Sequence, residues 1–424
     1  MNPIGRSARW EISEVALSQA IFGAMQVYIP WLAAVTAPIH ELAMLALAQS
    51  IVWPLGIFAQ LQLRTLYVVS GQQSLLPLFF QLRLGGCVFL FAAAAVSTVL
   101  LRAGILVVNL ALALALIKCA ELVADILHGE WQRAMKASRA ARSQTYRCLI
   151  FIVVYTIGMV WSGHLVLSLV AGAAAMACWV VVVDTGAGQV HWKLLSPHGS
   201  LNHVGPTLKA GLLLATGLAL TSLSMMVGRW AALRAGDTEV LAASALAGTM
   251  ASLVAMVVGA TGQYTLPWAR EQFRRGGTAG LRAWASSVNL RLHLAFAGLA
   301  AVWACAAFAL YAFGTVLPGQ RLGTAVQHTA IVLAGCFLAG GWLSVLCFTD
   351  STELYLTQRY GALLGAAVVQ VLAAAAASLL LYPLFGWIAI GIAELVRGLV
   401  FLAAMRFSTR GRHTHGTLAP SEEP

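Results

Sequence analysis

The chain consists of long apolar runs separated by short polar segments. Most runs contain about 20 residues, the length that an α-helix needs to cross the hydrocarbon core of a bilayer. The run at 148–162 is short and lies two residues before the next, so these two form either a tight hairpin or one broken span. The pattern predicts an all-α polytopic membrane protein with about twelve transmembrane helices, at residues 15–35, 42–63, 79–101, 104–127, 148–162, 165–183, 209–233, 240–266, 290–313, 323–348, 360–381 and 385–405.

Composition supports this class and excludes a soluble domain. Of the 424 residues, 60% are hydrophobic and only 10% are charged, so the surface of a soluble fold would consist largely of hydrocarbon. The formal net charge is +11. In a membrane protein, an excess of Lys and Arg is the usual bias of cytoplasmic loops. We therefore expect membrane lipids, and no nucleic acid, as partners.

The positions of Lys and Arg predict how the chain is oriented. With the N-terminus placed in the cytoplasm, most of the 26 Lys and Arg residues fall on cytoplasmic segments. The segments on the other side contain only Arg102, Arg229, Arg234 and Arg321. Because Lys and Arg accumulate in cytoplasmic loops, we predict a multi-pass membrane protein with both termini in the cytoplasm.

The chain also shows signs of an internal repeat. Six predicted spans precede the polar segment 184–209, six follow it, and both sets begin on the cytoplasmic side. The segment from Glu41 to Arg64 resembles the one from Glu239 to Pro267, although two Ala- and Leu-rich segments also match by chance. We predict two six-helix lobes, residues 1–190 and 191–407, related by a pseudo-two-fold axis along the membrane normal, and a disordered cytoplasmic tail, residues 408–424.

Three ionisable residues share one face of the fourth predicted span. At about 100° per residue, Lys118, Glu121 and Asp125 align with Gly129 and Gln132. An ionisable group near the centre of a membrane helix costs about 2.5–3.5 kcal/mol, so these side chains are expected to face protein or water. Two interpretations stay open: the stripe lines a hydrated translocation path, or Lys118 and Glu121 neutralise each other and only hold helices together.

Further cations lie at the ends of neighbouring spans. Gln62 and Arg64 end the second predicted span, Arg83 opens the third, and Arg229 lies near the outer end of the seventh. A guanidinium can bind two phosphate oxygens at once, so each Arg is a candidate for binding a phosphate of a cargo. The alternative is an anchor in the lipid headgroup region, which for Arg229 means a side chain that reaches outward to the interface.

Other motifs give no sign of catalysis. The chain contains no P-loop, G-x-S-x-G or H-E-x-x-H motif. Its seven cysteines form no C-x-x-C pair, and its histidines match no metal-binding spacing. We predict no catalytic residue, no cofactor and no metal. Glu394 and Arg397, three residues apart in the last span, are interpreted as a buried structural pair.

Three stretches carry a family resemblance. They are the segment 47–64 with its Gln-Leu-Arg end, the pattern Lys118…Glu121…Asp125-Ile126…Gly129…Gln132, and the second-half pattern Gly236-Asp237…Glu239…Gln263…Pro267. Together they resemble the Wzx-type lipid-linked oligosaccharide (O-antigen and exopolysaccharide) flippases of the MOP exporter superfamily. The usual Asp shortly after Gln-Leu-Arg is missing at residues 70–71. The resemblance implies two six-helix lobes around a V-shaped, alternating-access cavity.

The resemblance also implies a glycan on polyprenyl pyrophosphate as cargo, which moves from the cytoplasmic to the periplasmic leaflet of the bacterial inner (cytoplasmic) membrane. A pyrophosphate that crosses lipid alone loses its hydration at a large energetic cost, which cationic side chains along a cavity would offset. We further expect a polysaccharide polymerase and other assembly proteins as partners. The candidate path residues are Gln62, Arg64, Arg83, Lys118, Glu121, Asp125 and Arg229.

Two other functions stay open. A MATE-like cation or drug antiporter needs a carboxylate within a span, and Glu121 and Asp125 qualify. A membrane polysaccharide-modifying enzyme would need a sizeable periplasmic loop or a His or Arg cluster at a membrane face, whereas the predicted outside loops are only a few residues long. Basic residues outnumber acidic ones along the predicted path, which favours an anionic cargo and therefore the flippase.

Overall fold

The computed structural model describes residues 6–70, 76–134, 136–187, 204–313, 324–357 and 359–410, and over these ranges it contains helices and short connections but no strand. Ten stretches of these residues are long and apolar enough to cross a membrane. They do not include helix α1 (Arg6–Thr36) or the first part of the long helix α10 (Thr238–Phe313). With these two added, the helices account for the twelve predicted spans of a multi-pass membrane protein.

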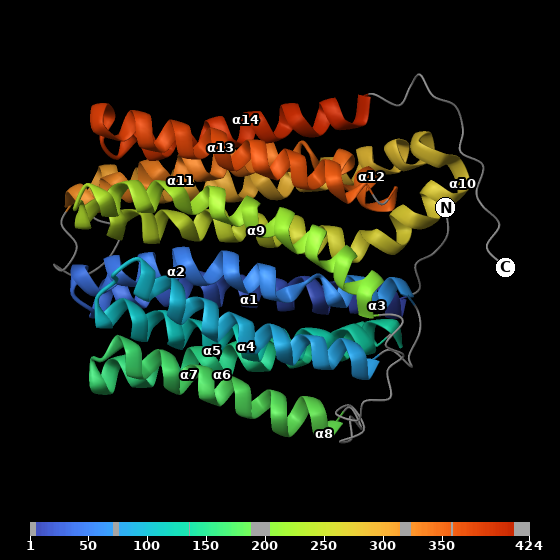
Figure 1. The fold of residues 1–424 in the computed structure, drawn as a ribbon, viewed down its shortest axis with the longest axis horizontal. Coiled ribbons are helices and arrows are strands. Elements are labelled where there is room, and N and C mark those ends of the chain that lie inside the picture. The colour runs from blue at the N-terminus through green and yellow to red at the C-terminus, as the bar shows by residue number, and fades with distance from the viewer. Residues whose placement is uncertain are drawn as a thin grey trace.

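The helices form two bundles, which correspond to the two predicted lobes (Figure 1). The N-terminal lobe contains α1, α2 (Ile39–Gln60), α3 (Leu63–Ser70), α4 (Leu76–Leu100), α5 (Ile105–Arg133), α6 (Ala137–Ser162), α7 (Leu165–Trp179), the π-helix η2 (Val180–Asp184) and α8 (Thr185–Ala187). The C-terminal lobe contains α9 (Val204–Arg234), α10, α11 (Thr324–Val345), α12 (Phe348–Leu356), α13 (Tyr360–Phe385) and α14 (Ile388–Arg410). The predicted boundary at 190/191 lies outside the described residues.

The two lobes repeat one packing order. Helix α1 packs on α6 as α9 packs on α13, and α6 packs on α7 as α13 packs on α14. Likewise, α5 contacts α4 and α7, while α11 contacts the second part of α10 and α14. The internal repeat predicted from the sequence is therefore present in the helix packing.

Several predicted boundaries were wrong because hydropathy shows only the part of a helix that lies in lipid. Helix α6 begins at Ala137, so the span predicted at 148–162 is a full-length helix, and most of the predicted loop 128–147 is helical. It forms a tight hairpin with α7 through Gly163, which has a φ of 65°. The predicted loop 267–289 is also helical, because α10 continues through a kink at Gly276 and Gly277. Helix α14 extends to Arg410, three residues into the predicted tail.

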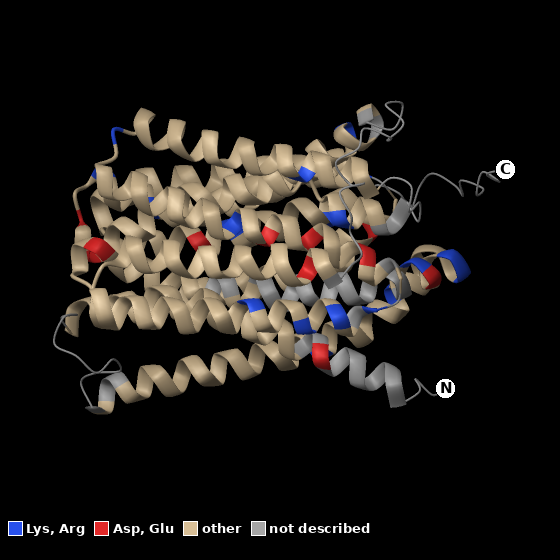
Figure 2. Cartoon of the chain, turned by 90° about the horizontal axis from the view of Figure 1, so that it is seen from below, with Lys and Arg blue, Asp and Glu red and all other residues tan. Residues whose placement is uncertain are grey.

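Helix α1 begins and helix α14 ends at the same end of the molecule (Figure 1). Figure 2 shows that Lys and Arg residues gather toward this end and are sparse at the opposite one. We call it the basic end. By the positive-inside rule it is the end expected to face the cytoplasm.

Helix α2 lies at the centre of the molecule. It packs against α4 and α5 of its own lobe and against α9 and α10 of the other. Its residues Leu42 to Val52 are buried almost without interruption, and many of them are Ala, which lets neighbouring backbones approach closely. A helix that is apolar on all sides is expected to be enclosed by others. The side of α2 that meets α9 and α10 therefore lies at the interface between the two lobes.

Candidate functional site

Helix α2 ends in a sharp elbow, where the sequence pattern predicted a straight span up to residue 63. Leu61 and Gln62 both adopt the left-handed conformation, with φ values of 47° and 48°, which is uncommon for residues other than Gly. The short helix α3 starts immediately afterwards. Gln62 lies at the elbow itself, where the Thr65 hydroxyl donates to its Oε1 over 3.4 Å. The elbow places Arg64 against α5 rather than at the end of a straight helix.

Asp125 bridges two of the predicted arginines. Its Oδ1 lies 2.9 Å from Arg64 Nη1, and its Oδ2 lies 2.7 Å from Arg83 Nη2. Arg64 Nε also donates to Gln132 Oε1 over 3.0 Å. Arg83 is fully buried and donates to the carbonyl oxygen of Gln60 over 2.6 Å. Arg83 is therefore no lipid anchor: it stabilises the C-terminus of α2 and shares one carboxylate with Arg64.

Lys118 and Glu121 form the predicted pair near the middle of α5, about two turns and one turn before Asp125. Lys118 Nζ lies 2.7 Å from Glu121 Oε2. The ammonium group also lies over the Trp53 ring, 4.7 Å from its centroid, in a cation–π contact. Gln26 of α1 donates its Nε2 to the other Glu121 oxygen over 3.3 Å. The pair is neutral, and it joins three helices of the N-terminal lobe.

Arg229 lies between the two lobes and is only 3% exposed. The interpretation as a side chain that reaches outward to the lipid interface was therefore wrong. Its Nη1 donates to the carbonyl oxygen of Ala46 in α2 over 3.1 Å, and its Nη2 donates to that of Ser244 in α10 over 3.0 Å. Among the described residues, no carboxylate lies within ion-pair distance of Arg229, and its Nε has no hydrogen-bond partner. A buried positive charge therefore faces the lobe interface without a counter-ion.

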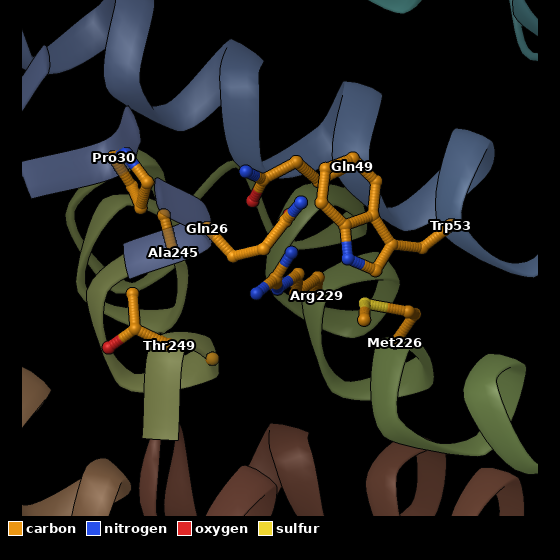
Figure 3. A pocket seen from close by; sticks show the side chains of 9 residues that line it. Gln26, Pro30, Gln49, Trp53, Met226, Arg229, Ala245 and Thr249 are labelled. Carbon is orange, nitrogen blue, oxygen red and sulfur yellow. The ribbon is translucent and has the colours of Figure 1, made fainter. Parts of the chain in front are cut away.

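Arg229 opens onto a small pocket between the lobes, with about 290 Å³ of empty space. Figure 3 shows the side chains of Gln26, Gln49 and Arg229 directed toward one another, with Trp53 beside them. The Oε1 atom of Gln26 is buried there without a hydrogen-bond partner. Gly248 of α10 also lines the pocket: a Cβ atom at this position would lie 2.1 Å from Arg229 Nη2. The pocket thus combines a cation and amide groups, and its shape depends on a glycine.

The three groups of charges form one series. Gln26 and Trp53 line the pocket and also contact the Lys118–Glu121 pair, and Asp125 follows Glu121 by about one turn of α5 toward the basic end. The series contains four cations and two carboxylates, so two positive charges remain unbalanced. Such an arrangement favours an anion and can pass it from one cationic group to the next. The predicted residues of this series are Arg64, Arg83, Lys118, Glu121, Asp125 and Arg229.

Glu394 and Arg397 lie apart from this series, within the C-terminal lobe. Both side chains are buried, and Arg397 Nε donates to Glu394 Oε2 over 2.8 Å. A Cβ atom at Gly340 of α11 would collide with Glu394. The prediction that Glu394 and Arg397 form a buried pair is confirmed, and a purely structural role stays a prediction.

Sequence reasoning did not select Gln26, Gln49 or Trp53. The signal was present, because a Gln inside an apolar span is expensive in lipid and is expected to find a polar environment. The polar environment of these side chains could not be located from the sequence, because the sequence does not show that α1, α2 and α9 meet at one pocket.

No family model and no curated protein sequence matches the chain. Solved structures do match it. One is the inward-facing conformation of a multidrug resistance MATE family transporter of the MOP superfamily, with 16% identity over 92% of this chain and 94% of that chain and a TM-score of 0.65. Another is the eukaryotic MATE transporter AtDTX14, with 13% identity over 94% of this chain and 95% of that chain and a TM-score of 0.59.

A third match is a MOP superfamily transporter from Pyrococcus furiosus, with 15% identity over 94% of this chain and 95% of that chain and a TM-score of 0.54. It is described as having a binding pocket of reverse polarity that suggests a different function. All three matches extend over both lobes. The chain therefore has the MATE-like transporter fold with two lobes.

Proposed function

We propose that this protein is a transporter that moves a polyprenyl-pyrophosphate-linked oligosaccharide from the cytoplasmic to the periplasmic leaflet of the bacterial inner membrane. The observation that carries the proposal is the buried, carboxylate-free guanidinium of Arg229 between the lobes. A guanidinium matches the geometry of phosphate oxygens. Burial of a charge without a counter-ion lowers stability, so its retention in the pocket points to a ligand of opposite charge.

The carboxylates of the series argue against a cationic cargo. Glu121 is paired with Lys118, and Asp125 is paired with two arginines. A cation would have to displace these partners before it could bind. An anion that enters from the cytoplasmic side instead meets Arg64 and Arg83, where it must displace Asp125, and then Arg229, which has no carboxylate to displace.

The size of the pocket requires that the lobes separate during transport. Only about 20 Å³ of the pocket admits a water-sized sphere, far less than the roughly 300–1,000 Å³ of a typical ligand site, and an oligosaccharide with its pyrophosphate is larger still. The lobes meet near the basic end, where Gly211 of α9 packs on the carbonyl of Leu61. They also meet at the level of the pocket, where Trp230 donates to the Ser50 hydroxyl over 2.9 Å, and beyond it, where Leu42 of α2 shares one buried apolar cluster with Leu241 of α10. We infer an occluded state from which alternating access opens one side at a time.

The membrane potential would favour this direction of transport. Moving a charge across the membrane changes the free energy by about 2.3 kcal/mol per 100 mV. A pyrophosphate with about two negative charges that leaves an inside-negative compartment therefore gains about 4–5 kcal/mol at 100 mV. No separate coupling ion is needed in this scheme.

A MATE-like cation or drug antiporter is the second candidate, because the fold is shared with multidrug MATE transporters. It would require Glu121 or Asp125 to release its partner and bind a cation. Normal glycan together with altered drug resistance in a strain that lacks the protein would favour this candidate.

The proposal is tested in a deletion strain. Lipid-linked oligosaccharides would be extracted after treatment with a membrane-impermeant sugar-modifying enzyme, which reports the leaflet in which they lie. We expect complete repeat units to accumulate in the cytoplasmic leaflet, and the intact gene to reverse this. Repeat units stranded in the outer leaflet would instead place the block after flipping and contradict the proposal.

A further inference from the structure

The N-terminal lobe has a second hollow, on the side of α5 that faces away from the charged series. Helices α4 and α7 both pack on α5 and leave part of its surface uncovered between them. The hollow has about 680 Å³ of empty space, and its walls are almost entirely apolar. We call it the lateral groove, and its lining includes Phe91, Asn109, Leu112, Leu116, Val166 and Val170.

Asn109 is the polar exception in the lateral groove. Its side chain is exposed, and the described residues provide no hydrogen-bond partner for it. It lies four residues after the start of α5, about 6 Å below the end of the helix that is opposite the basic end. An amide without a partner is unfavourable in lipid, and a polar group at this depth marks a ligand or partner by default.

A cation lies just outside the groove. Arg102 is exposed in the short turn between α4 and α5. It is one of the few basic residues expected on the outer side. From the surface inward, the chain therefore presents a guanidinium, then an amide, then apolar walls that continue to Leu116, about 10 Å deeper than Asn109.

This order matches the order of groups along a phospholipid: phosphate, ester carbonyl, acyl chain. We propose that the lateral groove binds one phospholipid of the outer leaflet, with its phosphate at Arg102, an ester carbonyl that accepts a hydrogen bond from Asn109, and one acyl chain between α4 and α7. The bound lipid satisfies the amide and covers the uncovered surface of α5. It fills the space between α4 and α7 and is expected to hold these two helices apart.

The groove is separate from the path of the transported cargo. Asn109 and Lys118 are nine residues apart on α5, which places them on opposite faces of the helix, about 180° apart. A cargo in the path between the lobes therefore does not reach the groove. In addition, the corresponding helices of the C-terminal lobe are closed by Trp303, which packs on Gly335 and donates to the carbonyl of Ile331 over 2.9 Å. The groove is thus a feature of one lobe and is independent of the proposed function.

The test is lipid binding to the purified full-length protein in detergent, measured by native mass spectrometry during titration with palmitoyl-oleoyl phosphatidylglycerol. Asn109→Leu removes the amide, and Leu116→Trp fills the inner end of the groove. Leu380→Trp, at a position that is 71% exposed on α13, is the matched control for an added Trp on a lipid-facing surface. We expect the first lipid to bind about tenfold more weakly to both groove variants and unchanged to the control.

Equal binding of the first lipid to all four proteins would overturn the proposal, because the bound lipid would then lie elsewhere on the surface. A second titration uses geranylgeranyl phosphate. If this isoprenoid occupies the groove and phosphatidylglycerol does not, the occupant is a carrier lipid and the proposal is wrong. Asn109 is exposed, so Asn109→Leu gives a decisive result even if Leu116→Trp does not fold.

Discussion

Replacement of Arg229 by Met separates a binding role from a structural one. Arg229 is 3% exposed and donates to two carbonyl oxygens, of Ala46 and Ser244. Both carbonyls lie inside helices, where backbone amides one turn on already bond to them. Loss of the guanidinium therefore leaves no orphaned acceptor. Arg229→Met keeps most of the side-chain volume and removes only the charge and the donors.

The structure sets the expected magnitudes. Replacement of buried ion pairs by apolar side chains of similar volume is often neutral or stabilises by about 1–4 kcal/mol. Arg229 has no carboxylate that its loss would leave unpaired, so the thermal midpoint of Arg229→Met should equal or exceed that of the wild type. A hydrogen bond to a charged group contributes about 1.5–3 kcal/mol. Loss of two such bonds to a cargo phosphate therefore weakens binding by about 3–6 kcal/mol, or about 10²–10⁴-fold.

The assay compares surface glycan in cells with the thermal midpoint of the purified protein, at matched protein levels. Arg234→Met, at an exposed position five residues further along, is the control for loss of one positive charge. We expect Arg229→Met to lose export by at least tenfold and the control to keep it. Normal export by Arg229→Met would refute the reasoning, and a lower thermal midpoint would show that the role of Arg229 is structural.

Four further perturbations test the pocket, the ion pairs and the driving force. Gly248→Ala should reduce export, because the added Cβ would lie 2.1 Å from Arg229 Nη2 and displace the guanidinium. Gly298→Ala is the control and should leave export unchanged, because its added Cβ contacts no other atom. Asp125→Asn leaves two arginines without their carboxylate, so we expect a loss of about 3–5 kcal/mol in unfolding free energy, measured by denaturant unfolding; an unchanged midpoint would contradict the shared ion pair. Glu394→Leu should lower the thermal midpoint, and Arg397→Leu added to it should restore most of the loss; export that stays low in the double variant would argue against a purely structural pair. Collapse of the membrane potential in vesicles should slow export, and an unchanged rate would exclude the potential as its driving force.

The fold could be predicted because the apolar runs are long enough to be recognised as spans. Their even number places both termini on the same side of the membrane. Hydropathy detects the part of a helix that lies in lipid, and the distribution of Lys and Arg separates the two ends. What it could not detect was the continuation of helices into water. Helix α6 begins eleven residues before the apolar run that predicted it, because Arg, Ala and Gln favour a helix in water as well.

The candidate site was predictable in part. The spacing of Lys118, Glu121 and Asp125 placed them on one face, and the structure adds that Arg64 and Arg83 meet Asp125. The elbow at Leu61 was not predictable, since no Gly or Pro marks it. For Arg229, a role in the path and a side chain that reaches the lipid interface both stayed open, because only its distance to the end of its helix was known. Position along a helix says nothing about which face meets the other lobe.

The most direct measurement of the central claim is transport by the purified protein in vesicles. A short-chain polyprenyl pyrophosphate that carries a fluorescent sugar would be incorporated, and a membrane-impermeant quencher would report its movement between leaflets. We predict rapid movement with the wild-type protein and little with Arg229→Met, and no movement of a cationic dye. Movement of the dye without movement of the pyrophosphate lipid would contradict the account and establish a cation transporter.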